Sequence, residues 1–483
     1  MARAPSLSIE SLTALGAEKL ARLVLDGADR DAAFKRIVAA ALAGAKGPKA
    51  VAALVDKRLA GLERARGFVE WDKVKAFAAD LDATVTTIIG ELGAADPVLA
   101  TVSLLRFLAT ADGVFERADD SQGRVQAVYE MAVEGLGQLA ARMPPADRAA
   151  LPDRIATALG QDHNDYLPRL IGQVGPHLDE ATLIAWDTRL AKVAKTAPKP
   201  KGREAEWEVT RRTQQQLAAR QMIAFVRRDL DAFAALEADK HRNLQDGFGL
   251  AKLFLDAGRP KDALIWIRKG RGTAIKYQSR ADLADGEVPR AFDAVPCAAL
   301  EADILDALNE KSAAQALRWS TFAATLNADI LRAFIGGLGE FEEFDALDRA
   351  FAHAGSAKAI HQALAFFIAW PQLERAAALV IKHHKAWNGA SYEFLAPAAE
   401  ALEGSHPVAA AILYRTLLVA ILTQGRSNAY GIGARYLAKL DDLGAEFEAA
   451  ALPDVASHVT FRAEIVKKHA RKAGFWAHVK KGM

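Results

Sequence analysis

The chain has 483 residues, a length of roughly three domains or one long repetitive array. Apolar residues make up 51% and charged residues 25%, which excludes wholesale disorder, a collagen-like repeat and a disulfide-stapled miniprotein. Because 62 basic side chains balance 60 acidic ones, the chain as a whole has no electrostatic reason to seek nucleic acid or a membrane.

Alanine-rich segments with apolar residues at helical spacing fill the N-terminal half. Ser8 is a candidate N-cap for a first helix, whose apolar stripe runs from Leu12 through Leu15, Leu20 and Leu23 to Val24. Glycine and proline separate the later segments. Further helices are predicted over 29–44, 48–65, 72–92, 97–111, 121–142, 145–160, 166–174 and 179–194.

Charged residues concentrate between two of these helices, over 112–124. Arg117, Asp119, Asp120 and Arg124 are the candidate interaction residues of this segment. One interpretation is a capped loop, in which Asp120 or Ser121 accepts from helix N–H groups and Arg117 pairs with an aspartate. The alternatives are a partner-contact surface and an oxygen-ligated cation, although the spacing does not fit an EF-hand.

A boundary is predicted where the sequence becomes rich in lysine and proline, over 192–203. We therefore expect an N-terminal helical domain over 1–195, a basic linker over 196–204 and a C-terminal helical-repeat domain over 205–483.

The C-terminal half begins with a polar helix over 204–228 and continues with an antiparallel helix pair over 244–270. The small residues Ala251 and Ala263 permit close approach in that pair, and a similar pair follows over 300–326. Later helices are predicted over 328–336, 341–353, 356–369, 371–386, 391–402, 407–424, 428–444, 453–472 and 475–481. Consecutive short helices with tight turns predict an all-α fold of stacked antiparallel helical hairpins, a tetratricopeptide-like α-solenoid.

The most apolar segment, 407–423, carries Arg415 at its centre. It is shorter than the roughly 20 residues that a bilayer requires, and a central arginine disfavours insertion. We expect a helix buried in the protein core.

Two basic patches in this half are candidate interaction surfaces. The first contains Arg268, Lys269, Arg271, Lys276 and Tyr277. The second, in the tail, contains Lys467, Lys468, Arg471 and Lys472. Basic residues near aromatic ones can hold phosphates and stack bases. The alternative for the tail is a solvated helix on which Phe475 and Trp476 dock as a cap.

No motif for catalysis, a cofactor or a metal is present. Phosphate-binding loops, nucleophile elbows and zinc-binding spacings are missing, so no catalytic, cofactor or metal residue is assigned. The only cysteine, Cys297, cannot form an intramolecular disulfide, and no signal peptide is recognisable at the N-terminus. These features predict a soluble cytoplasmic protein.

Several segments resemble an uncharacterised bacterial family of all-helical proteins, a domain of unknown function. They are VDKRLAGLERARGFVEW (55–71), LLRFLATADGVFERADDSQGRV (104–125), EADILDALNEKSAAQALRWSTFAATL (301–326), HPVAAAILYRTLLVAIL (406–422), GRSNAYGIGARYLAKL (425–440) and KKHARKAGFW (467–476). The C-terminal half is also similar to the tetratricopeptide-like helical region that follows SWIM-type zinc fingers, although the finger itself is absent. The resemblance implies a helical fold and no activity.

Stacked helical hairpins form extended binding surfaces without needing chemistry. We therefore predict a non-enzymatic scaffold that binds a protein or peptide. The alternative is a nucleic-acid-associated accessory protein that uses the basic loop 268–280 and the basic tail.

Overall fold

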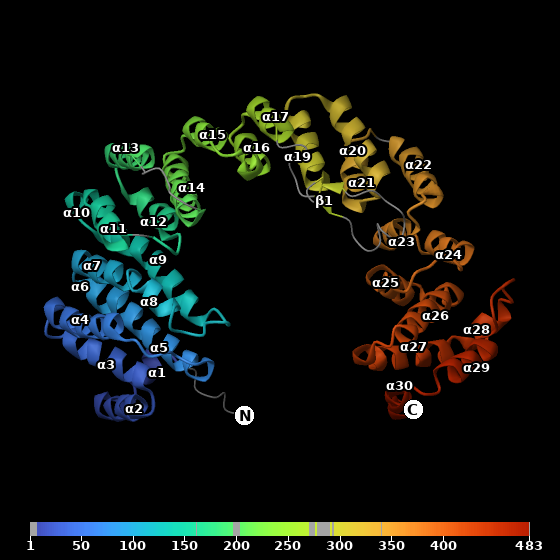
Figure 1. Cartoon of the computed structure of the whole chain (residues 1–483), viewed down its shortest axis with the longest axis horizontal. Coiled ribbons are helices and arrows are strands. Elements are labelled where there is room, and N and C mark those ends of the chain that lie inside the picture. The colour runs from blue at the N-terminus through green and yellow to red at the C-terminus, as the bar shows by residue number, and fades with distance from the viewer. Residues whose placement is uncertain are drawn as a thin grey trace. The chain divides into compact units, whose positions relative to one another are not determined.

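The computed structural model describes residues 7–160, 162–196, 203–269, 276–277, 290–291, 294–339 and 341–482. Most of these residues lie in helices, which confirms the predicted all-α, solenoid-like fold (Figure 1). Packing divides the chain into two units, unit 1 over Met1–Lys240 and unit 2 over His241–Met483. Each unit has a hydrophobic core of its own.

Unit 1 is a succession of helices joined by short turns. Its α-helices are α1 (Ile9–Thr13), α2 (Ala17–Arg30), α3 (Ala32–Gly44), α4 (Pro48–Arg64), α5 (Trp71–Thr87), α6 (Gly93–Ala95), α7 (Pro97–Leu108), α8 (Ala111–Phe115), α9 (Arg124–Arg142), α10 (Pro145–Ala149), α11 (Leu151–Leu159), α12 (Tyr166–Val174), α13 (Glu180–Thr196), α14 (Arg203–Val226) and α15 (Leu230–Ala238). A π-helical turn, η1 (Ile88–Leu92), continues α5, and a 3₁₀ turn, η2 (Gly175–His177), continues α12.

Unit 2 has the same construction. Its helices are η3 (Arg242–Leu244), α16 (Gly247–Asp256), α17 (Pro260–Lys269), α19 (Ala294–Ala307), α20 (Lys311–Thr325), α21 (Ala328–Ile335), α22 (Glu342–Ser356), α23 (Ile360–Ala369), α24 (Leu373–Lys382), α25 (Tyr392–Leu402), α26 (Pro407–Thr423), η4 (Ser427–Ala429), α27 (Tyr430–Asp442), α28 (Gly444–Ala449), α29 (His458–His469) and α30 (Ala473–Gly482). Among the described residues, the only strands are β1 (Lys276–Tyr277) and β2 (Arg290–Ala291), which pair antiparallel.

Side-chain caps explain many of the helix starts. Asp31 accepts hydrogen bonds from the backbone N–H groups of Ala33 and Phe34 at the start of α3. Asp96 accepts from Leu99, and Pro97 occupies the first turn of α7, where its missing N–H costs nothing. The start of α7 agrees with the prediction, whereas α3 begins three residues later than the predicted position 29.

The predicted single helix at the N-terminus is wrong in one respect, because the structure divides it into α1 and α2. Ser8 does cap α1, and its side chain accepts from the Ser11 N–H. Helix α1 ends at its C-cap Ala14, and Gly16 adopts a φ of +80° that separates α1 from α2. Glycine reaches this conformation without a Cβ penalty, so a local backbone break interrupts an otherwise continuous apolar stripe.

The core of unit 1 centres on α7 and α9. The rings of Phe107 and Tyr129 stack with centroids 4.6 Å apart, and both side chains are fully buried. The Tyr129 hydroxyl lies 2.7 Å from the Thr110 hydroxyl, so its polar end is satisfied inside the core. Burial is also the main reason why the pKa of Tyr129 is raised.

In unit 2, the predicted helix pair over 244–270 is confirmed as α16 and α17, in which Ala251 and Ala263 are fully buried. The apolar segment is confirmed as a buried helix, α26, and Arg415 within it is only 7% exposed. Across the described part of the chain, no helix combines the length and apolarity needed to span a bilayer.

The predicted linker over 196–204 falls largely on 197–202, outside the described residues. Helix α14, which follows it, packs with unit 1: Ala219 and Ile223 join that core, and Arg220 pairs with Asp187 of α13 at 2.8 Å. Packing therefore divides the chain after Lys240, while the predicted domain limits remain a prediction.

Candidate interaction surface

Exposed apolar side chains concentrate at the start of unit 1. Of the 25 large apolar side chains that are exposed among the described residues, 12 lie between Leu7 and Trp71. They are Leu7, Ile9, Leu12, Leu15, Leu23, Leu25, Phe34, Ile37, Leu42, Leu54, Phe68 and Trp71. Scattered apolar residues are normal on a surface, but nearly half of the exposed ones fall in this small part of the chain, which makes it a candidate interaction surface.

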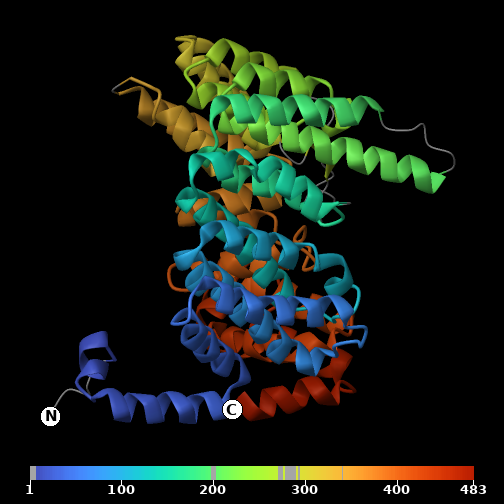
Figure 2. The same cartoon turned by 90° about the vertical axis from the view of Figure 1, so that its left-hand side faces the viewer.

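The packing of α2 explains part of this exposure. Figure 2 shows α1 and α2, in blue, extending from the stacked helices of unit 1. The main neighbour of α2 is α3, and Ala28 is its only buried residue. A single neighbouring helix cannot cover a wide apolar face, so Leu23 and Leu25 remain 51% and 63% exposed.

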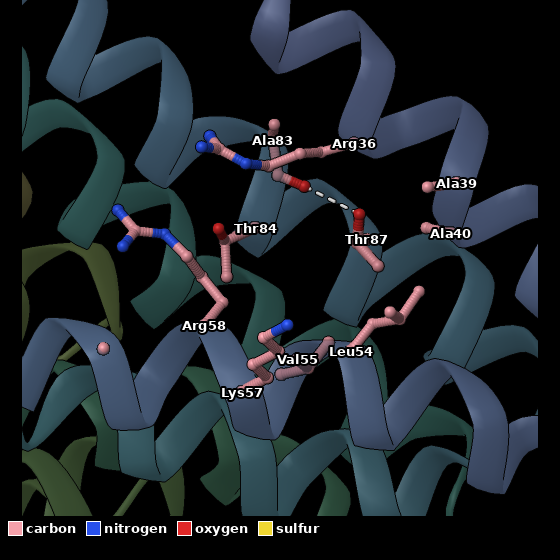
Figure 3. A pocket seen from close by; sticks show the side chains of 11 residues that line it. Arg36, Ala39, Ala40, Leu54, Val55, Lys57, Arg58, Ala83, Thr84 and Thr87 are labelled. Atoms are coloured by element: carbon pink, nitrogen blue, oxygen red, sulfur yellow. Dashed lines mark hydrogen bonds between the residues drawn. The ribbon is translucent and has the colours of Figure 1, made fainter.

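A pocket opens beside this region, between α3, α4 and α5 (Figure 3). Its cavity volume is about 320 Å³, and Ala39, Ala40, Leu54, Val55 and Ala83 supply apolar walls. The two threonines that line it direct their hydroxyls to their own helix, where Thr84 donates to the Asp80 carbonyl and Thr87 to the Ala83 carbonyl. The pocket therefore suits an apolar group.

One side of the pocket is basic. Arg36 and Arg58 both pair with the half-buried carboxylate of Asp80. Burial lowers the pKa of Arg58, and repulsion from Arg36 and Arg117 lowers it further. Lys57, also in the lining, forms no ion pair with any described residue. A ligand that combines an apolar group with a carboxylate would match this arrangement.

Next to the pocket helices, the α4–α5 loop presents two aromatic side chains. Phe68 is 58% exposed, and Trp71, the first residue of α5, is 69% exposed. The loop is held in place by the segment after α8, since the Val69 N–H donates to the Arg117 carbonyl at 2.8 Å and the Asp119 N–H donates to the Val69 carbonyl at 3.1 Å. Exposed aromatics on a fixed backbone are typical anchors of protein interfaces.

The predicted acidic–basic loop is a capped loop. Asp120 accepts from the backbone N–H groups of Val125 and Gln126, at 2.9 and 2.8 Å, and so caps α9. The predicted pairing of Arg117 with an aspartate is wrong: its guanidinium lies 5.2 Å from the centre of the Phe77 ring and contacts the Gly67 carbonyl.

The remaining two residues of that loop have local partners. Asp119 accepts from the Ser121 N–H, and Arg124 donates to the Gln122 side chain at 2.9 Å. No group of three or more His, Cys, Asp or Glu side chains that could hold a metal occurs among the described residues.

The first basic patch of unit 2 is only partly described. Arg268 pairs with the buried Glu301 at 3.0 Å, and the Lys269 ammonium lies 4.3 Å from the centre of the Trp266 ring. Arg271 lies outside the described residues. Lys276 and Tyr277 form β1, and nothing is described of their side chains.

The tail patch lies on α29 and the turn that follows it. Lys468 pairs with Glu464 at 2.7 Å, and Lys472 lies near the Tyr430 ring and hydroxyl. The predicted docking of the tail aromatics is confirmed, because Phe475 is fully buried and Trp476 donates its N–H to the His469 carbonyl at 3.0 Å. Lys467 and Arg471 form no ion pair with the residues described.

Sequence reasoning placed its candidate residues in both units and missed the pocket of unit 1. The lining residues Arg36, Lys57 and Thr84 come from three helices, so no single motif contains them. The available signal was the apolar stripe of α2, because only Ala28 of that helix is buried.

Residues 2–478 match the family of unknown function DUF6880. The chain belongs to that family. No curated protein matches the chain, and no solved structure does.

Proposed function

We propose that this chain is a non-enzymatic cytoplasmic scaffold that binds a protein or peptide through the start of unit 1. The observation that carries the proposal is the coincidence of exposed apolar side chains, an apolar pocket and basic groups on α1 to α5. The pocket accepts an apolar side chain of the partner, and Lys57 attracts a carboxylate beside it. The single cysteine supports a reducing compartment.

Affinity capture from the native cell, read by mass spectrometry, tests this function with matched variants. Leu54→Asp places a charge at the pocket, and Trp71→Ala removes an anchor from the surface. Ile184→Asp is the control, because Ile184 is also in unit 1 and is 45% exposed, compared with 43% for Leu54. Circular dichroism checks that all variants are folded.

We expect one partner to be captured by the wild type and by Ile184→Asp, and to be lost with Leu54→Asp. We expect Trp71→Ala to weaken binding of the purified partner by about 1–2 kcal/mol, a common cost of truncating an interface anchor. If the wild type and all three variants retain the same proteins in the same amounts, the start of unit 1 is not the binding surface.

The alternative, nucleic-acid binding by the tail, draws support from Lys467 and Arg471, which form no ion pair with any described residue. Base stacking by the tail aromatics has less support, because Phe475 is fully buried and Trp476 is engaged with the His469 carbonyl. Retention on DNA or RNA that weakens steeply with salt would favour this alternative, since phosphate contacts release counterions. Failure to bind at low salt would remove it.

A further inference from the structure

The last two helices of unit 2, α29 and α30 (red in Figure 1), border a groove with a cavity volume of about 1100 Å³. Most of the side chains that line it are apolar, and four of them are alanines. They are Val459, Ala463, Val466, Ala470, Ala473, Trp476, Ala477 and Val479. Val459 and Val466 are 73% and 46% exposed, so no described residue covers the α29 side of the groove.

The spacing of these residues is that of a helix-packing surface. The α29 residues Val459, Ala463 and Val466 and the C-cap residue Ala470 follow one another at intervals of four, three and four residues, which places them on one face. Other faces hold the helices in place: Ile465 of α29 and Phe475 of α30 are buried in the core of unit 2. Each helix therefore has a core face and a second apolar stripe along the groove.

The alanines indicate what fits there. Small side chains at helical spacing allow another helix backbone to approach closely, and an amphipathic helix in an apolar groove is a recurrent mode of recognition. A peptide in an extended conformation would leave its backbone groups without partners against alanine walls, whereas a helix satisfies its own.

The charges at the groove have a single sign. Arg462, Lys467 and Lys480 line it, and no acidic residue does. Arg462 pairs with Asp441 at 2.9 Å, while Lys467 and Lys480 form no ion pair with any residue that the structure describes. Two copies of this groove facing each other would bring like charges together, so the charge pattern favours an acidic occupant over a second copy of the chain.

We propose that the groove between α29 and α30 binds an amphipathic helix of a partner protein, with an apolar stripe flanked by acidic residues. The apolar stripe of that helix lies on Val459, Val466 and the alanines. Its carboxylates pair with Lys467 and Lys480. This site lies in unit 2 and is independent of the surface proposed for unit 1.

Fluorescence anisotropy of labelled helical peptides with the full-length chain tests the proposal. The first peptide, of about 18 residues, carries leucines at intervals of three and four with glutamates on both flanks. The second has the same leucines with lysine flanks, and the third is a scramble of the first. Two altered chains probe the groove: Val466→Asp, and the double variant Lys467→Glu with Lys480→Glu.

The matched control is the double variant Lys468→Glu with Arg471→Glu, which changes the charge of the tail equally without altering residues that line the groove. We expect the acidic peptide to bind the wild type and the control alike, and to bind the two groove variants at least about tenfold more weakly. The lysine-flanked and scrambled peptides should not bind.

Four outcomes would overturn the proposal. They are no binding of the acidic peptide at low salt, equal binding of the lysine-flanked peptide, equal weakening by the control variant, and displacement of the acidic peptide by a single-stranded oligonucleotide. A dimer in light scattering that the groove variants dissociate would assign the groove to a second copy and would also contradict the proposal.

Discussion

At the scale of single residues, Arg415 is a charged side chain buried in unit 2, at 7% exposure. It lies on the buried helix α26 and forms no ion pair with the residues that the structure describes. Its guanidinium stacks over the Phe447 and Phe461 rings, with its centre 3.8 and 4.7 Å from theirs, and it donates to the Ala456 carbonyl at 2.6 Å. The planar group is therefore held by two rings and a carbonyl.

This arrangement predicts different effects for two replacements of Arg415. Arg415→Lys keeps the charge but loses the planar stacking, so we expect the free energy of unfolding to fall by about 2 kcal/mol. Arg415→Met removes the buried charge, which offsets the lost contacts, so we expect a change within about 1 kcal/mol. Urea denaturation at neutral pH measures the free energy of unfolding of both variants. An equal decrease for Arg415→Lys and Arg415→Met would contradict the role of the planar group.

Burial also gives Arg415 a pH dependence. It lowers the pKa of the guanidinium from 12.5 to about 10 in the folded chain. Below that value both the folded and unfolded states carry the charge, and the cost of burying it is fully present. As the pH rises through about 10, the folded state loses its proton first, so the wild type gains stability relative to Arg415→Met. The difference in the free energy of unfolding between the wild type and Arg415→Met, measured at about pH 8 and about pH 11, isolates this group. If that difference is the same at both pH values, the pKa of Arg415 is not lowered.

At the scale of elements, the start of α9 depends on one side chain. The carboxylate of Asp120 accepts from two backbone N–H groups, those of Val125 and Gln126, which have no carbonyl partner within the helix. We expect Asp120→Ala to lower the free energy of unfolding by about 1–2 kcal/mol.

Asp119→Ala is the control in the same loop, since this carboxylate accepts only a 3.3 Å hydrogen bond from Ser121. We expect a loss below about 0.5 kcal/mol for it. The midpoints of urea denaturation of Asp120→Ala and Asp119→Ala, measured at the same pH, compare the stability that each variant loses. Similar losses would show that the loop is stabilised by its overall charge, with no special role for the cap.

The same scale shows what the sequence can and cannot predict. The start of α7 was predicted correctly at Pro97, because Asp96 acts on an N–H group only three residues away. The start of α3 was predicted at residue 29, whereas α2 continues to Arg30 and α3 begins at Ala32, after the cap Asp31. The break between α1 and α2 was not predicted, because the apolar stripe continues on both sides of Gly16, where the backbone adopts a positive φ. The pocket could not be predicted from the sequence either, because the pairing of Arg36 and Arg58 with Asp80 joins three helices that only tertiary packing brings together.

At the scale of the whole molecule, two separate cores imply two separate unfolding events. The core of unit 1 extends from α4 to α14, and that of unit 2 extends from α20 to α30. Leu136 and Leu413 are fully buried, one in each core. We expect Leu136→Ala and Leu413→Ala each to lower the stability of one transition by about 2–5 kcal/mol and to leave the other unchanged.

A third variant decides between the two ways of dividing the chain. The sequence places the boundary at 196–204, which assigns α14 to the C-terminal domain, whereas packing assigns α14 to unit 1. Ile223 of α14 is 1% exposed and belongs to the same core as Leu136. Ile223→Ala should therefore destabilise the transition that responds to Leu136→Ala, by about 2–4 kcal/mol in denaturant unfolding followed by circular dichroism. If it shifts the transition that responds to Leu413→Ala, α14 unfolds with unit 2 and the boundary at 196–204 is the correct one. A single transition shifted equally by all three variants would show instead that the two cores unfold together.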